Sequence, residues 1–194
     1  RRGLTCWEKM KSYKKLKLKL NKQAIDEVVN LPYYVYEDRD LKESVLACAI
    51  KSIDGQPNNL FKNIPDLCKD YKLTSIAGQI PTITKYITSF KCDVGRARIF
   101  RQEPGKITQK HIDEENYHNP KEKHLRVWIA INGNPDFKIL LGDDEITLNT
   151  GEAIVFDPDS AHGAKNLSKT ETRFSLNLII KPNNWLKENC IEYW

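Results

Sequence analysis

The pattern of hydrophobic and polar residues changes near residue 90 of this 194-residue chain. After that point, short runs rich in β-branched and aromatic residues are separated by turn-forming groups such as Pro104-Gly105. Runs of this length, bounded by Gly, Pro, Asn and Asp, are typical of β-strands. Many short strands at regular spacing predict a β-sandwich or barrel, and among these we expect a jelly roll. The predicted strands cover residues 97–101, 125–131, 137–141, 145–148, 153–156 and 173–180.

The first 90 residues carry spacings that are typical of helices. In the segment 40–53, for example, Leu41 and Val45 fall on one helical face. Asp40 is a suitable N-cap for that helix. The predicted helices cover residues 21–30, 40–53 and 64–71.

Residues 15–20 alternate lysine with leucine. This period of two predicts an edge strand with its leucines inward and its lysines in water. We therefore expect one domain over residues 1–194, with mainly β structure and flanking N-terminal helices. Its predicted parts are a helix-rich support region with the basic edge strand (1–90), a jelly-roll catalytic core (91–181) and a C-terminal tail (182–194).

The five cysteines are odd in number, widely spaced and without a C-x-x-C pair. This usage favours free thiols in a reducing compartment over a disulfide framework or a zinc knuckle. No apolar stretch approaches the roughly 20 residues that a membrane span needs. We therefore expect a soluble, cytoplasmic protein that does not bind membranes.

Chemistry is suggested first by the triplet His111-Ile112-Asp113. Residues two apart on a strand project to the same face, so an imidazole nitrogen and a carboxylate oxygen can converge on one metal ion. The pair is a weak signal alone, but the Pro104-Gly105 turn precedes it and fits a turn that feeds a strand.

A second histidine occurs in a similar context about fifty residues later. Gly151 begins a turn, the strand 153–156 follows, and the next turn leads to His162. A rolled sheet can bring such a histidine beside His111 and Asp113. Two imidazoles and one carboxylate on one face of a metal ion are the ligand set of non-haem Fe(II) oxygenases.

Arg173 and Ser175 lie two residues apart on the last predicted strand. The planar fork of an arginine can hold the distal carboxylate of a keto acid, and a serine hydroxyl can add a hydrogen bond. The alternative is a surface salt bridge. The packing decides between them, because Arg173 points into the barrel only if the apolar face of 173–180 packs on the N-terminal helices.

Taken together, residues 97–181 resemble double-stranded β-helix Fe(II)/2-oxoglutarate dioxygenases, and more narrowly the aspartyl/asparaginyl β-hydroxylase family, which includes cis-proline hydroxylases. The spacings between glycines and histidines are also similar to those of cupins in general. The resemblance implies a cupin-like double-stranded β-helix. It rests on Pro-Gly-x5-His-x-Asp at 104–113, the strand 125–130, Gly-Glu at 151–152 with His162 and Asn166, and Arg173-x-Ser175.

The resemblance also implies roles for individual residues. His111, Asp113 and His162 would bind Fe(II) as the catalytic centre. Arg173 would pair with the C5 carboxylate of the cosubstrate 2-oxoglutarate, helped by Ser175. The implied reaction consumes O2, hydroxylates a C–H bond and releases succinate and CO2. The implied substrate is an amino acid or an amino-acid side chain in a polypeptide.

Two further cavity positions follow from the resemblance. Arg126 matches a strand arginine that contacts the substrate or the cosubstrate. Trp128 stands where members of the family usually have histidine.

Two other functions are compatible with the sequence. One is a metal-binding cupin enzyme that does not use 2-oxoglutarate, in which Arg173 would have no anion to bind. The other is a non-catalytic module whose basic arm binds nucleic acid, since residues 1–30 hold nine Lys and Arg against three Asp and Glu, a net charge of +6. We favour a solvated lysine face and expect no nucleic-acid partner.

Overall fold

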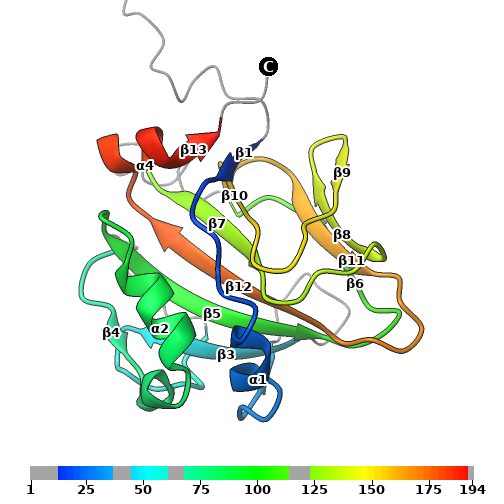
Figure 1. Cartoon of the computed structure of the whole chain (residues 1–194), viewed down its shortest axis with the longest axis horizontal. Coiled ribbons are helices and arrows are strands. Elements are labelled where there is room, and N and C mark those ends of the chain that lie inside the picture. Colours follow the sequence, from blue (N-terminus) through cyan, green and yellow to red (C-terminus); the bar gives the residue numbers. More distant parts are fainter. Residues whose placement is uncertain (1–12, 37–44, 61–67, 114–122, 192–194) are drawn as a thin grey trace, which may run out of the picture.

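A long antiparallel sheet, the major sheet, runs through the molecule (Figure 1). The structure is a computed structural model that describes residues 13–36, 45–60, 68–113 and 123–191. Within these residues the major sheet has nine strands, in the order β13-β1-β10-β7-β12-β5-β3-β2, with β4 paired to β3. The strands are β1 (Tyr13–Leu16), β2 (Tyr34–Tyr36), β3 (Val45–Ser52), β4 (Lys72–Leu73), β5 (Val94–Gln102), β7 (Leu125–Ala130), β10 (Ala153–Phe156), β12 (Arg173–Ile180) and β13 (Cys190–Ile191).

A second antiparallel sheet, the minor sheet, has the order β6-β11-β8-β9. From β5 to β12 the chain passes repeatedly between the two sheets, because β6, β8, β9 and β11 lie in the minor sheet while β7 and β10 lie in the major one. This alternation is the double-stranded β-helix, and it confirms the predicted jelly roll. The minor strands are β6 (Ile107–His111), β8 (Phe137–Leu141), β9 (Asp144–Ile146) and β11 (His162–Asn166).

Short helices cover the outer face of the major sheet (Figure 1). They pack through Val28, Ile83 and Ile87 in a core that also holds Leu176 and Leu178 of β12. Alternate residues of β12 therefore point away from the helices, toward the interior between the sheets. The helices are α1 (Ala24–Val28), the 3-10 helix η1 (Ser75–Gln79), α2 (Pro81–Thr88) and, near the C-terminus, α4 (Asn184–Asn189).

The predicted helix over 40–53 is wrong for its described part, which is strand β3 (Val45–Ser52). Ala47, Cys48 and Ile50 have no exposed surface, so this strand is buried on both faces. A strand buried on both faces is a continuous apolar run, which periodicity cannot distinguish from a buried helix. The N-terminal region thus contributes strands to the major sheet as well as helices.

The other N-terminal predictions have mixed outcomes. The helix over 21–30 is confirmed as α1, whereas α2 was not predicted. The helix over 64–71 lies mostly outside the described residues, and its described end is a turn. No helix among the described segments is long and apolar enough to cross a membrane.

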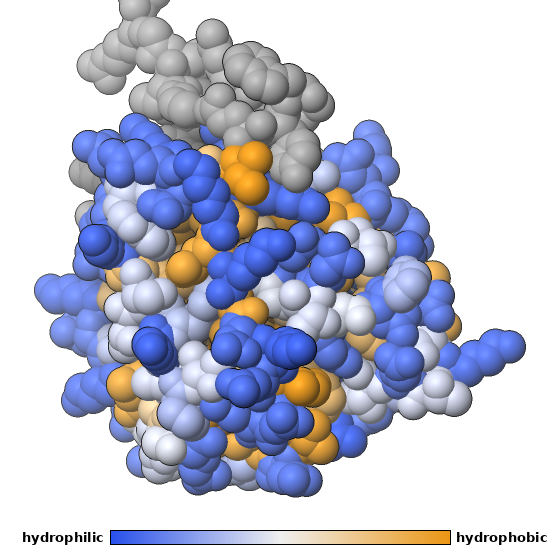
Figure 2. Space-filling view, in the orientation of Figure 1, coloured by the Kyte–Doolittle hydropathy of each residue, from blue (hydrophilic) through white to orange (hydrophobic). Residues whose placement is uncertain are grey.

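The basic segment 15–20 has the predicted alternation but not the predicted position. Leu16 and Leu20 are buried, and Lys17 and Lys19 are exposed. However, β1 is not an edge strand, because β13 from the C-terminal tail pairs with it on the side away from β10. Hydrophilic residues dominate the molecular face shown in Figure 2, and hydrophobic residues there form separate small areas.

Candidate active site

Two histidines are brought together by the pairing of β6 with β11 in the minor sheet. His162 lies opposite His111 in the register, and the ring centroids are 4.5 Å apart. The register shifts just after His162. Gly163 occupies this irregular position, where a Cβ atom would lie 2.7 Å from the carbonyl oxygen of Thr108. The absence of a side chain at Gly163 thus permits the close approach that places the histidines side by side.

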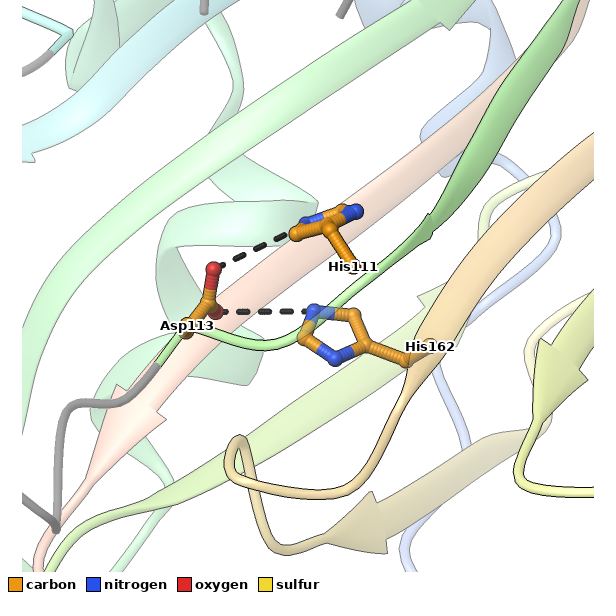
Figure 3. Close-up of side chains that lie close together, drawn as sticks. All are labelled: His111, Asp113 and His162. Carbon is orange, nitrogen blue, oxygen red and sulfur yellow. Dashed lines mark ion pairs between the residues drawn. The ribbon is translucent and has the colours of Figure 1, made fainter. Parts of the chain in front are cut away.

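Asp113 completes the cluster from the segment just after β6 (Figure 3). Its Oδ1 lies 3.6 Å from His111 Nε2, and its Oδ2 lies 3.5 Å from His162 Nε2. Ligand atoms of the three side chains all lie within 4.8 Å of one another. The structure therefore assembles the predicted two-histidine, one-carboxylate set from residues about fifty positions apart.

Hydrogen bonds orient both imidazoles toward Asp113. His111 Nδ1 lies 3.0 Å from the carbonyl oxygen of Gln109, and His162 Nδ1 lies 2.8 Å from that of Ser160. A carbonyl oxygen only accepts, so each Nδ1 carries a proton and each Nε2 faces the cluster. This is the arrangement of metal-binding histidines, in which the second nitrogen fixes the tautomer.

Arg126 of β7 reaches across from the major sheet and pairs with Asp113. Its Nη2 donates to Asp113 Oδ2 over 2.5 Å. Burial raises the pKa of Asp113, but the positive charge of Arg126 and the nearby imidazoles outweigh burial and hold this pKa well below its usual range. Asp113 is therefore a carboxylate.

The donor set fits a divalent cation such as Fe(II). Two imidazole Nε2 atoms and a carboxylate lie within 4.8 Å of one another, so one divalent cation could bind all three groups. Arg126 donates to Oδ2 of Asp113, and Oδ1 lies toward His111 Nε2, where it could act as a ligand. Two imidazoles and one carboxylate are the facial set that suits Fe(II) and leaves coordination positions open.

A cavity of about 690 Å³, which includes the space at its mouth, lies against the cluster between the two sheets. The structure brings every predicted site residue to its lining, namely His111, Asp113, Arg126, Trp128, His162, Arg173 and Ser175.

Arg173 points into this cavity and is 5% exposed. Its Nη1 donates to Gln102 Oε1 over 3.2 Å, and its guanidinium lies 5.2 Å from the centre of a Trp128 ring. Burial lowers the pKa of Arg173 to about 10. No carboxylate of the described residues pairs with Arg173. The alternative of a surface salt bridge is therefore excluded within this part of the chain. A buried guanidinium without an anion is costly, so the site fits a ligand carboxylate.

Trp128 and Ser175 lie beside Arg173. Ser175 is 3% exposed and follows Arg173 on the same face of β12. Trp128 Nε1 is buried and has no acceptor among the described residues. An indole nitrogen only donates, so Trp128 offers an unsatisfied N–H to a ligand in the cavity, as a protonated histidine nitrogen at this position would.

Sequence reasoning missed five polar residues of the lining: Tyr36, Arg98, Gln102, Thr108 and Asn177. Arg98 lies within the predicted strand 97–101, between Ala97 and Ile99. A charged residue that alternates with apolar ones was an available signal. Alternation alone, however, does not tell which face of a strand points into the barrel.

Comparisons with known proteins agree with this geometry. The family model described as aspartyl/asparaginyl beta-hydroxylase matches residues 61–182. None of the curated proteins compared matches this chain.

Solved structures with similar folds include several oxygenases. A 2OG-Fe(II) oxygenase family oxidoreductase from Burkholderia pseudomallei is 13% identical, with a TM-score of 0.56 over 84% of this chain and 78% of that one. The epimerase SnoN from nogalamycin biosynthesis, described as non-heme and alpha ketoglutarate dependent, is 12% identical, with a TM-score of 0.53 over 88% and 78%. The collagen prolyl hydroxylase vCPH of Paramecium Bursaria Chlorella virus-1 is 15% identical, with a TM-score of 0.51 over 90% and 97%. At these identities the likeness shows a shared fold.

Proposed function

The chain belongs to the aspartyl/asparaginyl β-hydroxylase family and is a 2-oxoglutarate-dependent hydroxylase, and on this premise we propose which residues carry the reaction. His111, Asp113 and His162 hold Fe(II), and Arg173 holds the far carboxylate of 2-oxoglutarate. The substrate is an amino acid or an amino-acid side chain in a polypeptide. The supporting observation is that three ligand side chains and a buried, anion-free arginine line one cavity.

The protein residues bind and orient the reactants. Arg173 offers two parallel N–H groups to the C5 carboxylate of 2-oxoglutarate, which fixes the length of cosubstrate that fits between this residue and the ligand cluster. Ser175 and the N–H of Trp128 donate further hydrogen bonds to the cosubstrate. The chemistry that Fe(II) and 2-oxoglutarate supply together is oxidative: O2 is consumed, succinate and CO2 are released, and one oxygen atom enters a substrate C–H bond.

Arg126 positions Asp113. By donating to Oδ2, it fixes the carboxylate plane and leaves Oδ1 directed at the cluster. Such neighbours of metal ligands tune both the orientation and the affinity of a site. Contact between Arg126 and the substrate or the cosubstrate stays a prediction.

Cellular placement and organisation belong to the same proposal. A cytoplasmic location is supported by the free thiols of Cys48, Cys68, Cys92 and Cys190. One oxygenase domain over residues 1–194 is supported by the major sheet, which combines strands from both ends of the chain. Two lysines of the basic segment pair with Glu152: Lys15 Nζ lies 3.8 Å from its Oε2, and Lys19 Nζ lies 3.6 Å from its Oε1. This partial pairing within the chain is consistent with a solvated lysine face.

Succinate release with and without Fe(II), measured over a panel of free amino acids and peptides, tests the proposed function. We expect release to require Fe(II) and to fall at least about 100-fold in His111→Ala, because a metal ligand is lost. His118→Ala, which removes a histidine outside the predicted ligand set, is the matched control. Wild-type release by His111→Ala would show that the ligand assignment is wrong.

A further inference from the structure

A second buried cation, Arg98, faces the cavity from β5. It is 2% exposed. Its Nη1 donates to Tyr36 Oη and to the carbonyl oxygen of Leu60, both over 2.9 Å. The guanidinium also lies 5.0 Å from the ring centre of Tyr36 and 5.2 Å from that of Phe100. These partners are all neutral, and no described residue forms an ion pair with Arg98.

Arg98 and the metal-ligand cluster line the same cavity from different sheets. β5 and β6 run in opposite directions from a shared turn, and near that turn Gln102 Nε2 bonds Thr108 Oγ1 over 3.3 Å. Four residues from Gln102 along β5 is Arg98, and three residues from Thr108 along β6 is His111. At about 3.3 Å per residue, Arg98 and His111 are similarly distant from the turn. Both residues line the same cavity.

Among the described residues, Arg98 has no anionic partner in the cavity. Its described lining holds three arginines and one carboxylate. Asp113 neutralises Arg126, and the proposed function gives Arg173 a cosubstrate carboxylate. Arg98 is the remaining cation. A guanidinium this deeply buried favours an anion as its partner, and the neutral acceptors on Nη1 do not supply one.

An unsatisfied acceptor lies beside Arg98. Asn177 of β12 is its direct neighbour in the strand register, and both residues line the cavity. Asn177 Oδ1 is buried and has no donor among the described residues. An amide oxygen in this state favours an N–H group as its partner.

We propose that Arg98 and Asn177 form the substrate subsite, and that they bind the carboxylate and the amino group of a free α-amino acid. A free amino acid carries an anion and an N–H donor on one carbon, which matches a buried cation that lacks an ion-pair partner among the described residues and an adjacent unsatisfied acceptor. An internal residue of a polypeptide has no α-carboxylate to offer Arg98. Tyr36 Oη and the carbonyl oxygen of Leu60 accept hydrogen bonds from the guanidinium and hold it in place. The inference rests on the proposed function and narrows its substrate class.

Direct binding tests this subsite. Each of the twenty common L-amino acids is titrated by calorimetry into the protein loaded with Mn(II) and 2-oxoglutarate, and the tightest binder is compared with its carboxamide and its N-acetyl derivative. We expect both derivatives to bind about 30-fold more weakly, because each loses one ionic group that the subsite recognises. Failure of every free amino acid to bind overturns the inference. So does a carboxamide, an N-acetyl derivative or a peptide that binds as tightly as the free amino acid.

Two variants assign the effect to the named residues. Arg98→Gln should weaken binding of the free amino acid about 30-fold and leave binding of its carboxamide unchanged, so that the two ligands bind with equal affinity. Asn177→Leu should reduce the loss of affinity that N-acetylation of the amino acid causes. This variant remains informative if Arg98→Gln does not fold. Arg101→Gln, on the opposite face of β5 and paired with Glu103, is the matched control. Unchanged discrimination in both variants would overturn the assignment.

The same experiment separates this inference from the proposed function. If wild-type protein binds neither Mn(II) nor 2-oxoglutarate, the proposed function fails. If it binds both, and Arg98→Gln binds 2-oxoglutarate with wild-type affinity while amino acids do not bind to either protein, only the subsite is wrong.

Discussion

Replacing Arg173 with glutamine should abolish tight binding of 2-oxoglutarate without unfolding the protein. Arg173 is buried in the cavity wall, and its polar partner within the protein is the neutral Gln102. The substitution therefore removes a buried cation and breaks no described ion pair. A glutamine side chain retains one neutral donor group at the same position.

The magnitude follows from the bonds that the ligand would lose. A bidentate guanidinium–carboxylate pair contains two charge-assisted hydrogen bonds, each worth about 1.5–3 kcal/mol, and a neutral glutamine restores about 1 kcal/mol. The net loss is about 3 kcal/mol, on the order of 100-fold in Kd. Stability of the unliganded protein should change by no more than about 1 kcal/mol, because loss of the Trp128 stacking and the Gln102 bond offsets relief of the desolvated charge.

The assay combines calorimetric titration of 2-oxoglutarate into Mn(II)-loaded protein with urea unfolding of the unliganded protein. Arg173→Lys keeps the charge but not the planar fork, so its affinity should fall between those of the wild type and Arg173→Gln. Wild-type affinity in Arg173→Gln would refute the reasoning. A destabilisation of about 3 kcal/mol would also refute it, since that loss is expected for a buried ion pair within the protein.

Three further predictions follow from the structure. Gly163→Ala should weaken Mn(II) binding about tenfold in equilibrium dialysis, because the added Cβ meets the β6 backbone beside the ligands. Gly78→Ala is the control, since Gly78 has open space around it, and it should bind Mn(II) like the wild type. Equal affinity in both variants would contradict the role given to Gly163. Trp128→Phe removes the unsatisfied N–H but keeps a ring, and it should raise the Kd for 2-oxoglutarate about fivefold in the same calorimetric titration; an unchanged Kd would show that the indole does not bind it. Cys48 is fully buried, and burial raises its pKa to about 12, so at pH 8 mass spectrometry should find it unmodified by iodoacetamide in the native protein and modified in urea; equal modification rates in the two conditions would contradict its burial.

Local sequence patterns identified the strands whose runs end at clear turn signals. The predicted segments 137–141, 153–156 and 173–180 coincide with β8, β10 and β12. Turn residues act through local backbone geometry, so they can be read without knowledge of the tertiary structure. Strand β3 was misassigned because burial on both faces, a property of its neighbours in space, removes the period-two signal.

The predicted site residues line one cavity, and their spacing along the sequence was enough to identify them. His111 and Asp113 lie two apart, and Arg173 follows His162 on a later strand, as a rolled sheet requires. Whether Arg173 faced the interior depended on the packing of the opposite side of β12 against the helices. Arg98 and Asn177 became visible only through the register of β5 with β12, which pairs residues 79 positions apart. No local pattern contains that information.

Metal stoichiometry tests the central claim most directly. Equilibrium dialysis against Mn(II) in the presence of 2-oxoglutarate should give one ion per wild-type chain and none at the same concentration for His111→Ala, Asp113→Ala or His162→Ala, all in folded protein by circular dichroism. One ion per chain retained in all three variants would place the metal elsewhere and contradict the assignment of the active site.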